Sequence, residues 1–356
     1  MQEKTALIAM SGGVDSSVAA YLVQQAGYRC AGAILHMVPP SLLGQAEGSV
    51  CGSAQSIEDA RQVAQRLGIE LDVIPAADAF RENVVEPFIR CYAQGGTPNP
   101  CITCNKHMKF AYLLEAAQQQ GFDKVVTGHY ARIREEKGRF VLYKAADPGK
   151  DQTYFLAGLT QQQLSRCLFP LGELTKDQVR AIAQQQGFLN AKKRDSQDIC
   201  FIPDGDYPAF IARYTGETPT PGDFLDLEGN PVGRHSGAIA YTIGQRKGLG
   251  LAMGQPVYVC SKDMVKNTVT VGPDPALFTD TLLAKDWNWL PFERLTESMQ
   301  VQAKVRSRHL PQEATVYPED GGFARVVFRE PQRAITPGQA VVLYQGDLVV
   351  GSGTII

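Results

Sequence analysis

The chain has 356 residues, of which 44% are hydrophobic and 20% are charged, and its formal net charge is −2. This length exceeds what a single hydrophobic core usually supports, so we expect two or three domains, and the composition excludes a disordered or fibrous protein. No apolar run of about 18 residues and no signal-peptide pattern is present, so we expect a cytoplasmic protein without a membrane span. The charge balance excludes a generally basic surface, and nucleic-acid binding would need a local basic face.

Apolar runs and amphipathic stretches alternate through the first part of the chain, around a Gly/Ser/Pro-rich loop at 39–52. The patterns predict strands at 4–10, 30–35, 71–75 and 124–128 and helices at 16–27, 57–67, 80–92 and 110–120. Strands that alternate with helices of this length predict an α/β domain with a parallel sheet covered on both faces.

This rhythm ends near Pro203, and residues 218–233 are dense in Thr, Pro, Gly and Asp, as in a linker or the entry to a new domain. The later segments are short and strand-like, and they lie at 238–243, 256–261, 267–271, 300–305, 313–320, 323–330 and 339–356. Their spacing and Gly/Pro punctuation favour a small β-barrel. We therefore expect a parallel-sheet domain over 1–205, a small central domain over 206–276 and a C-terminal β-barrel over 277–356.

The sequence SGGVDSS at 11–17 lies between the first predicted strand and the first predicted helix. Adjacent glycines let a backbone approach a ligand closely and adopt positive φ, and the helix start offers unpaired N–H groups to an anion. The serine hydroxyls add donors. The loop is not a Walker A motif because the Lys-Ser/Thr ending is missing. The alternative is an ordinary strand–helix turn capped by Asp15 or Ser16.

Eight cysteines are scattered along the chain, and in a cytosolic protein such cysteines are buried, catalytic or metal-binding rather than disulfide staples. Two of them lie in TPNPCITCN at 97–105, which predicts a rigid, turn-rich loop ahead of a helix. The helix start and the basic side chains at 106, 107 and 109 should lower a thiol pKa there. A CxxC pair also suits zinc or a thioredoxin-like site, but a second CxxC and a correctly spaced His pair are missing. A third cysteine lies in DSQDICFI at 195–202 and by itself indicates only a core position.

The loop at 11–17 resembles the PP-loop of ATP pyrophosphatases, which split ATP into AMP and pyrophosphate to adenylate a carbonyl oxygen. The segments that follow it closely match the tRNA-specific 2-thiouridylase family, and we identify the sequence as a member. They are TPNPCITCNKHMKF (97–110), TGHYAR (127–132), KDQTYFL (150–156), DSQDICFI (195–202), YTIGQRKGLG (241–250), KVRSRHL (304–310) and PGQAVVLYQGD (337–347). The resemblance covers essentially the whole chain.

This resemblance implies ATP-dependent 2-thiolation of the wobble uridine in the tRNA anticodon stem-loop, through adenylation of O2 and sulfur transfer from a cysteine persulfide. It makes Cys104 the nucleophile and Cys200 the persulfide carrier. The residues it places at ATP are Ala9, Met10, Ser11, Gly12, Gly13, Val14, Asp15, Ser16, Leu35 and Gly128. The residues it places at tRNA are Asn99, Pro100, Cys101, His129, Lys150, Asp151, Gln152, Arg306, Ser307 and Gln339. The basic run at 192–194 adds candidates for contact with tRNA phosphates.

The implied cofactors are ATP and Mg²⁺, and the implied partners are tRNA and a sulfur-donor protein such as a cysteine desulfurase or a sulfur-relay carrier. The resemblance implies that the central domain and the barrel contact tRNA, and we expect a monomer. Some family members have Asp where this chain has Cys101, so Cys101, Cys104 and Cys200 could ligate an iron–sulfur cluster. They could equally exchange persulfide and disulfide without metal, which we favour, and we assign no metal site.

Two other functions fit parts of the sequence. Another PP-loop ligase or amidotransferase, adenylating a small carbonyl substrate, would explain SGGVDSS but neither the two cysteine segments nor a C-terminal barrel. A nucleotide-binding regulatory or RNA-binding module would need no catalysis. Mass spectrometry of tRNA nucleosides, after incubation with ATP and a sulfur donor, separates the three functions.

A slightly acidic chain can bind tRNA only through a local basic face, so its affinity should fall steeply with salt because bound phosphates release counterions. We expect filter-binding measurements between ~50 and ~200 mM salt to show this fall. Binding that does not change over this interval would contradict an electrostatic tRNA interface.

Overall fold

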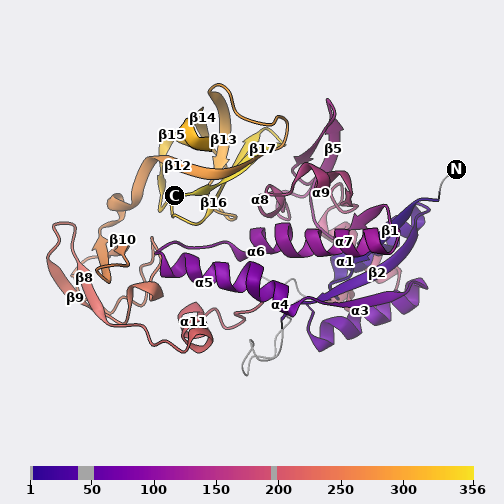
Figure 1. Ribbon diagram of the computed structural model, residues 1–356, viewed down its shortest axis with the longest axis horizontal. Coiled ribbons are helices and arrows are strands. Elements are labelled where there is room, and N and C mark those ends of the chain that lie inside the picture. Colours follow the sequence, from indigo (N-terminus) through magenta and orange to yellow (C-terminus); the bar gives the residue numbers. More distant parts are fainter. Residues whose placement is uncertain (1–2, 39–51, 194–198) are drawn as a thin grey trace.

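The protein is described by a computed structural model that covers residues 3–38, 52–193 and 199–356. Figure 1 shows the N-terminal parallel sheet at the right, a smaller four-stranded sheet at the left, and the C-terminal barrel above the helices that lie between them. No helix in the described ranges is long and apolar enough to cross a membrane. The loop predicted at 39–52 lies outside the described residues apart from Gly52.

The N-terminal sheet has five parallel strands in the order β3-β2-β1-β4-β7, which confirms the predicted fold class. Their bounds are β1 Thr5–Ala9, β2 Arg29–His36, β3 Leu71–Pro75, β4 Lys124–Val126 and β7 Cys167–Leu168. Because side chains alternate along a strand, Leu7 packs into one apolar cluster while Ala6 and Ile8 pack into another on the opposite face. A central strand buried on both faces explains the continuous apolar run that predicted it.

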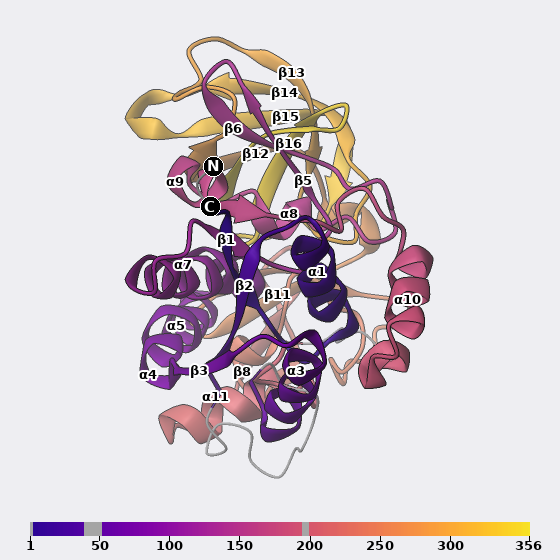
Figure 2. The same ribbon diagram turned by 90° about the vertical axis from the view of Figure 1, so that its right-hand side faces the viewer.

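Helices cover both faces of this sheet (Figure 2). On one face lie α1 Val14–Gln25, α3 Ala54–Leu67 and α10 Lys176–Gln185. The other face carries two longer helices that each contain a π-helical segment. They run through α4 Ala77–Phe80, Arg81–Val85 and α5 Glu86–Ala93, and through α6 Pro100–Thr103, Cys104–Lys109 and α7 Phe110–Gln119.

The second of these helices begins ten residues before the predicted start at 110, so the prediction of a loop at 97–105 is wrong for most of that segment. Pro100 occupies the first helical turn, where its fixed φ favours the helix and its missing N–H costs no hydrogen bond. A proline that indicated a turn therefore starts the helix. Cys101 and Cys104 consequently lie in its first turns.

The central part carries α11 Tyr207–Thr215 and a four-stranded sheet in the order β10-β11-β8-β9. The strands are β8 Gly222–Leu225, β9 Pro231–His235, β10 Tyr258–Asp263 and β11 Thr268–Gly272. The segment 218–233, expected as a linker, thus contains β8 and the start of β9, because its turn residues belong to the hairpin between them. The strand predicted at 238–243 is wrong: Ala238–Ala240 forms a 3₁₀ turn, and Ala238 and Tyr241 are buried in the small core.

The C-terminal part is a six-stranded antiparallel barrel, closed where β12 pairs with β17. Its strands are β12 Phe278–Trp289, β13 Met299–Lys304, β14 Gln312–Pro318, β15 Ala324–Arg333, β16 Ala340–Gln345 and β17 Leu348–Ile355. A hairpin from the N-terminal part, β5 Arg132–Glu136 and β6 Arg139–Tyr143, continues this sheet where Tyr143 pairs with Leu348. The sequence patterns did not predict this hairpin.

Short helices connect the remaining segments. They are α8 Thr153–Leu156, α9 Gln161–Ser165, and the 3₁₀ turns Leu189–Lys192, Asp274–Leu277 and Asp320–Gly322. The hairpin is held to the barrel by a hydrogen bond from Arg139 Nε to the Leu290 carbonyl, at 2.8 Å. The N-terminal part and the barrel therefore share a sheet and side-chain contacts.

Candidate active site

The PP-loop connects β1 to α1, and its two glycines differ in backbone conformation and in the atoms around them. Gly12 has φ +72°, and a Cβ there would lie 2.4 Å from the Ser56 carbonyl oxygen at the start of α3. Gly13 is extended at φ −94°, and the nearest atom to a Cβ there is Ser11 Oγ at 3.3 Å. The backbone therefore requires glycine at 12, whereas at 13 the missing side chain leaves one side of the loop uncovered.

The serine hydroxyls, expected as donors to a ligand, are used within the loop. Ser16 Oγ and Ser17 Oγ both donate to the Gly13 carbonyl, at 2.9 and 3.0 Å, and Ser11 Oγ donates to Ser16 Oγ at 3.2 Å. No described side chain caps the start of α1, so the alternative of a turn capped by Asp15 or Ser16 is not found. The loop therefore offers an anion its backbone N–H groups and the positive end of the helix dipole.

Asp15 points away from the loop into a nearly buried ion pair. Lys176 Nζ donates to both Asp15 carboxylate oxygens at 2.8 Å, and the Tyr130 hydroxyl donates to Oδ1 at 2.8 Å. The Lys176 side chain is only 7% exposed. A Cβ on Gly128 would lie 2.6 Å from the Asp15 carbonyl carbon, so the end of β4 and the first turn of α1 are in direct contact.

The other residues expected at ATP have buried side chains. Met10 is 2% exposed and Leu35 5% exposed, and each packs into a sheet-face core. The Met10 amide donates to the Ala33 carbonyl at 2.8 Å. Together with Ala9 at the end of β1, they line the carboxyl edge of the sheet, where ligands of parallel α/β sheets bind.

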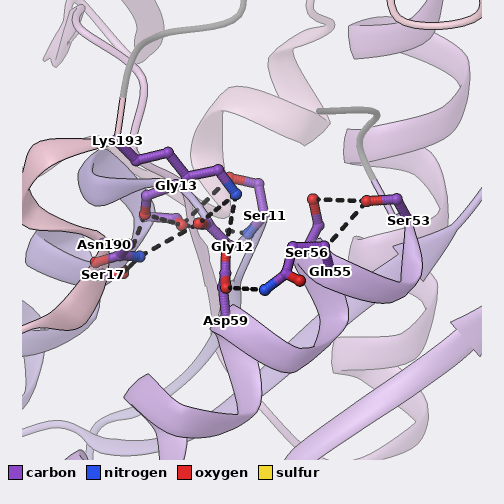
Figure 3. A network of polar contacts seen from close by, with 11 residues as sticks. Ser11, Gly12, Gly13, Ser17, Ser53, Gln55, Ser56, Asp59, Asn190 and Lys193 are labelled. Atoms are coloured by element: carbon purple, nitrogen blue, oxygen red, sulfur yellow. Dashed lines mark hydrogen bonds and ion pairs between the residues drawn. The ribbon is translucent and has the colours of Figure 1, made fainter. Parts of the chain in front are cut away.

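Lysine and asparagine side chains distant in sequence contact the backbone of the PP-loop (Figure 3). Asn190 Nδ2 donates to the Gly12 carbonyl at 3.2 Å and to Ser17 Oγ at 2.9 Å. Lys193 Nζ donates to the same Gly12 carbonyl at 3.3 Å and to Asp59 Oδ2 at 2.6 Å. The sequence indicated Lys193 only as part of a basic run, expected on tRNA, and gave no signal for Asn190 or Asp59.

The helix that runs from Pro100 to Gln119 carries Cys101 and Cys104, and we call it the cysteine helix. It contacts the same sheet edge. Cys104 is 7% exposed within an apolar cluster, and the partly exposed Cys200 packs against that cluster. Cys101 is exposed, yet loss of water around its thiol raises its pKa, and the nearby Lys109 ammonium only partly opposes this. The predicted lowering of this thiol pKa is therefore wrong for Cys101, because desolvation outweighs the helix start and the neighbouring charges.

No group of three or more His, Cys, Asp or Glu that could hold a metal ion exists in the part of the chain that the structure describes. Cys101, Cys104 and Cys200, which lie within the described ranges, do not come together as one ligand set. The described residues also offer no carboxylate cluster to Mg²⁺, since Asp15 is occupied by Lys176 and Tyr130.

His129 joins the phosphate loop to the cysteine helix. It directly follows Gly128, and its ring packs on Phe110 of the cysteine helix and on Phe169, with centroids 5.7 and 5.9 Å away. Its Nδ1 lies 2.8 Å from Thr127 Oγ1. Burial, aided by the Lys109 charge, lowers the pKa of His129 to about 3, so its imidazole is neutral at physiological pH.

Several residues expected at tRNA have side chains engaged within the protein. Asp151 Oδ2 accepts from Thr153 Oγ1 at 2.7 Å, and Gln152 Oε1 accepts from the Tyr130 amide at 2.9 Å. Arg306 Nη2 donates to the carbonyls of Ile243 and Ala334 and to Thr336 Oγ1. Lys150 and Ser307 are half-buried. Asp151, Gln152 and Arg306 thus shape the surface on which they lie.

Gln339 of the barrel holds the segment that leads into the cysteine helix. Its Nε2 donates to the Thr97 and Pro98 carbonyls at 2.8 and 3.2 Å, and the Thr97 amide donates to the Pro337 carbonyl at 2.8 Å. Asn99 and Pro100 follow this clamp directly, so the barrel positions the residues expected to face the target base.

Family models match most of the chain: a tRNA methyl transferase HUP domain at 4–204, a tRNA methyl transferase PRC-barrel domain at 208–273 and an aminomethyltransferase beta-barrel domain at 279–355. The chain is 47% identical to the tRNA-specific 2-thiouridylase MnmA of Clostridium acetobutylicum, over 99% of each chain. It is 49% identical to the protein of that name from Heliobacterium modesticaldum, over 99% of this chain and 93% of that one. A solved 4-thiouridine synthetase bound to RNA and ATP is 16% identical over 56% of this chain and 45% of that one, with a TM-score of 0.37.

The two glycines of the loop should respond differently to alanine. Gly12→Ala should lower the free energy of unfolding by about 1–3 kcal/mol, because it combines positive φ with a backbone clash. Gly13→Ala should cost less than about 1 kcal/mol, because its backbone is extended and Ser11 Oγ can rotate away. Urea denaturation of both variants tests this, and equal losses would contradict the assignment of the strained position to Gly12.

The clamp on Thr97 should be visible in hydrogen exchange. Gln339→Glu removes both donated hydrogen bonds and places a carboxylate against two carbonyls, so the Thr97 amide should exchange roughly tenfold faster. Gln345→Glu is the matched control, because Gln345 Nε2 donates to the Gln300 carbonyl within the barrel. Unchanged exchange at Thr97 in Gln339→Glu would show that the barrel does not hold this segment.

Proposed function

The chain belongs to the tRNA-specific 2-thiouridylase family, and from that premise we propose that it uses ATP to exchange the C2 oxygen of the wobble uridine in tRNA for sulfur. The observation that carries the proposal is the corner at Gly128 and His129. Gly128 contacts the first turn of α1 behind the PP-loop, and His129 packs on the cysteine helix. A nucleotide on the loop and a base near the cysteines would therefore meet at one sheet edge.

The first step is adenylation of the uridine. The C2 oxygen leaves poorly as hydroxide at neutral pH, whereas AMP is a good leaving group once O2 has attacked the α-phosphorus. The PP-loop N–H groups and the α1 dipole stabilise the departing pyrophosphate. Mg²⁺ usually binds substrate phosphates and keeps several waters, so we assign it to ATP rather than to a protein ligand set.

The second step is sulfur transfer. We propose that a sulfur-donor protein loads Cys200 as a persulfide, whose terminal sulfur attacks C2 of the adenylated uridine as AMP leaves. Cys104 then attacks the Cys200 sulfur, so the S–S bond of the persulfide breaks and a Cys104–Cys200 disulfide forms. A two-electron thiol reductant regenerates both thiols. Cys104 lies in the apolar side-chain cluster against which Cys200 packs, and this shared environment supports the pairing of the two cysteines.

The tRNA would lie across all three parts of the chain. We propose that 1–205 carries the chemistry, and that 206–276 and 277–356 bind tRNA around a flipped-out base. Asn99, Pro100 and Cys101 would face the base, with His129, Lys150, Ser307 and the clamp residue Gln339 near the RNA. Both cysteines belong to one chain, so a monomer suffices.

The function is tested by incubating the protein with unmodified tRNA, ATP and a sulfur donor, followed by mass spectrometry of the nucleosides. We expect 2-thiouridine together with AMP and pyrophosphate. The mass gained distinguishes exchange of oxygen for sulfur from addition of a methyl group. ATP cleavage that needs no tRNA would instead favour a ligase that adenylates a small carbonyl compound.

The three cysteines should give three different phenotypes. Cys200→Ser should abolish thiolation, because a hydroxyl cannot carry transferable sulfur. Cys104→Ser should accept sulfur at Cys200 and accumulate the persulfide without efficient transfer. Cys101→Asp should keep substantial activity by the metal-free route, since the carboxylate still accepts hydrogen bonds near the base. Activity and iron lost together in Cys101→Asp would overturn that route in favour of a cluster.

A further inference from the structure

The PP-loop has no cation of its own. The sequence SGGVDSS contains neither Lys nor Arg, and its serine hydroxyls bond within the loop. ATP brings several negative charges on its β- and γ-phosphates, and a phosphate loop of the Walker type meets them with a lysine. A lysine from elsewhere in the fold could serve the same purpose.

Two lysines reach the loop, and they differ in how firmly they are held. Lys176 is bound to both oxygens of Asp15 and is 7% exposed, so its charge is neutralised behind the loop. Among the residues that the structure describes, Lys193 pairs with the Asp59 carboxylate and also donates to the neutral Gly12 carbonyl at 3.3 Å. Its side chain is 25% exposed. Lys193 is the more easily moved of the two.

If Lys193 moved away, the Gly12 carbonyl and Asp59 Oδ1 would each keep a hydrogen bond from a described residue. The Gly12 carbonyl keeps the hydrogen bond from Asn190 Nδ2, at 3.2 Å. Asp59 keeps the hydrogen bond from Gln55 Nε2 to its Oδ1, at 2.8 Å. Lys193 also borders a hollow of about 600 Å³ between α3 and residues 187–193, which Asp59 and Asn190 help to line.

Asp59 stays charged beside Lys193. Although burial opposes ionisation, the hydrogen bonds from Lys193 and Gln55 hold the pKa of this carboxyl below its ordinary value. Asp59 therefore attracts the ammonium at physiological pH and competes with any phosphate for it.

We propose that Lys193 is a further ATP-binding residue, whose ammonium exchanges the Gly12 carbonyl for oxygens of the β- and γ-phosphates. The ammonium would exchange a neutral carbonyl acceptor for an anionic phosphate oxygen, and the added attraction between opposite charges favours this exchange. Asp59 is the competing partner that holds Lys193 beside the loop when no nucleotide is bound. This role rests on the proposed use of ATP at the PP-loop, where Lys193 would be the cation that binds the β- and γ-phosphates.

The test is isothermal titration of the full chain with ATP, inorganic pyrophosphate and AMP. Lys193→Met should raise the Kd for ATP and for pyrophosphate roughly 10- to 100-fold, as expected for a lost charged hydrogen bond. The Kd for AMP should stay unchanged, because AMP lacks both phosphates in question. Lys193→Arg should bind all three ligands within a few-fold of the wild type.

Asp59→Asn is the matched control, because it breaks the same ion pair from the other side. If Lys193 were only structural, both variants would weaken pyrophosphate binding alike. If Lys193 binds phosphate, the Asp59→Asn substitution removes the carboxylate that competes for it. Pyrophosphate should then bind at least as tightly to Asp59→Asn as to the wild type. Thermal unfolding of both variants verifies that they fold, and Lys193→Gln replaces Lys193→Met if the latter does not.

Two results would overturn the inference: wild-type pyrophosphate affinity in Lys193→Met, or equal weakening in Lys193→Met and Asp59→Asn. Failure of the proposed function looks different. In that case the wild type would not bind ATP, or Gly13→Val would bind it normally although its side chain fills the uncovered side of the loop. A third pattern would contradict only the role of Lys193. In that pattern the wild type binds ATP, Gly13→Val does not bind it, and Lys193→Met binds it as tightly as the wild type.

Discussion

The first turn of α1 lies directly against the backbone that follows β4, and this contact exists because residue 128 has no side chain. A Cβ there would come within 2.6 to 2.9 Å of three backbone atoms of Asp15 and Ser16. The approach sets the height of the PP-loop above the sheet and brings Tyr130, two residues after Gly128, to Asp15. It also places His129 on the cysteine helix, so both halves of the site take their positions from this one corner.

The charges around the PP-loop are arranged in matched pairs. Asp15 with Lys176 and Asp59 with Lys193 each place a carboxylate against an ammonium in partly or nearly buried surroundings. Such pairs contribute little net stability, because the cost of removing both charges from water offsets their attraction. Their value here is positional: they hold two lysines beside a loop whose own sequence is neutral apart from Asp15.

The three parts of the chain are joined by direct contacts between them, and not only by the segments that link them along the chain. Gln339 and Pro337 of the barrel grip Thr97, and the hairpin β5–β6 extends the barrel sheet from the N-terminal part. Arg306 links the barrel to the central part through the Ile243 carbonyl. Residues expected to touch RNA therefore also hold the parts together, and a substitution at Arg306 would alter the surface as well as its charge.

Much of the fold was predictable where neighbours in sequence decide the structure. Apolar runs identified the first four strands, most clearly the central strand β1, whose burial on both faces leaves an uninterrupted signal. The edge strand β3 also has the predicted bounds, although none of its residues is fully buried. Pro100 misled the prediction, since the same fixed φ suits a turn and a helix start. The segment at 132–143 alternates weakly, and it forms a hairpin with five cross-strand pairs that also joins the barrel sheet where Tyr143 pairs with Leu348.

The amino-acid sequence by itself determined the PP-loop, the cysteine segments and the family, because these are short motifs whose spacing along the chain carries their chemistry. Only the tertiary structure decided which groups surround that loop. Asn190 and Lys193 are far from Gly12 in sequence yet bond its carbonyl, and Gln339 reaches Thr97 across the barrel interface. It also decided that the serine hydroxyls face inward and that desolvation raises the pKa of Cys101. Burial and contacts between distant segments set these properties, and a short sequence motif specifies neither of them.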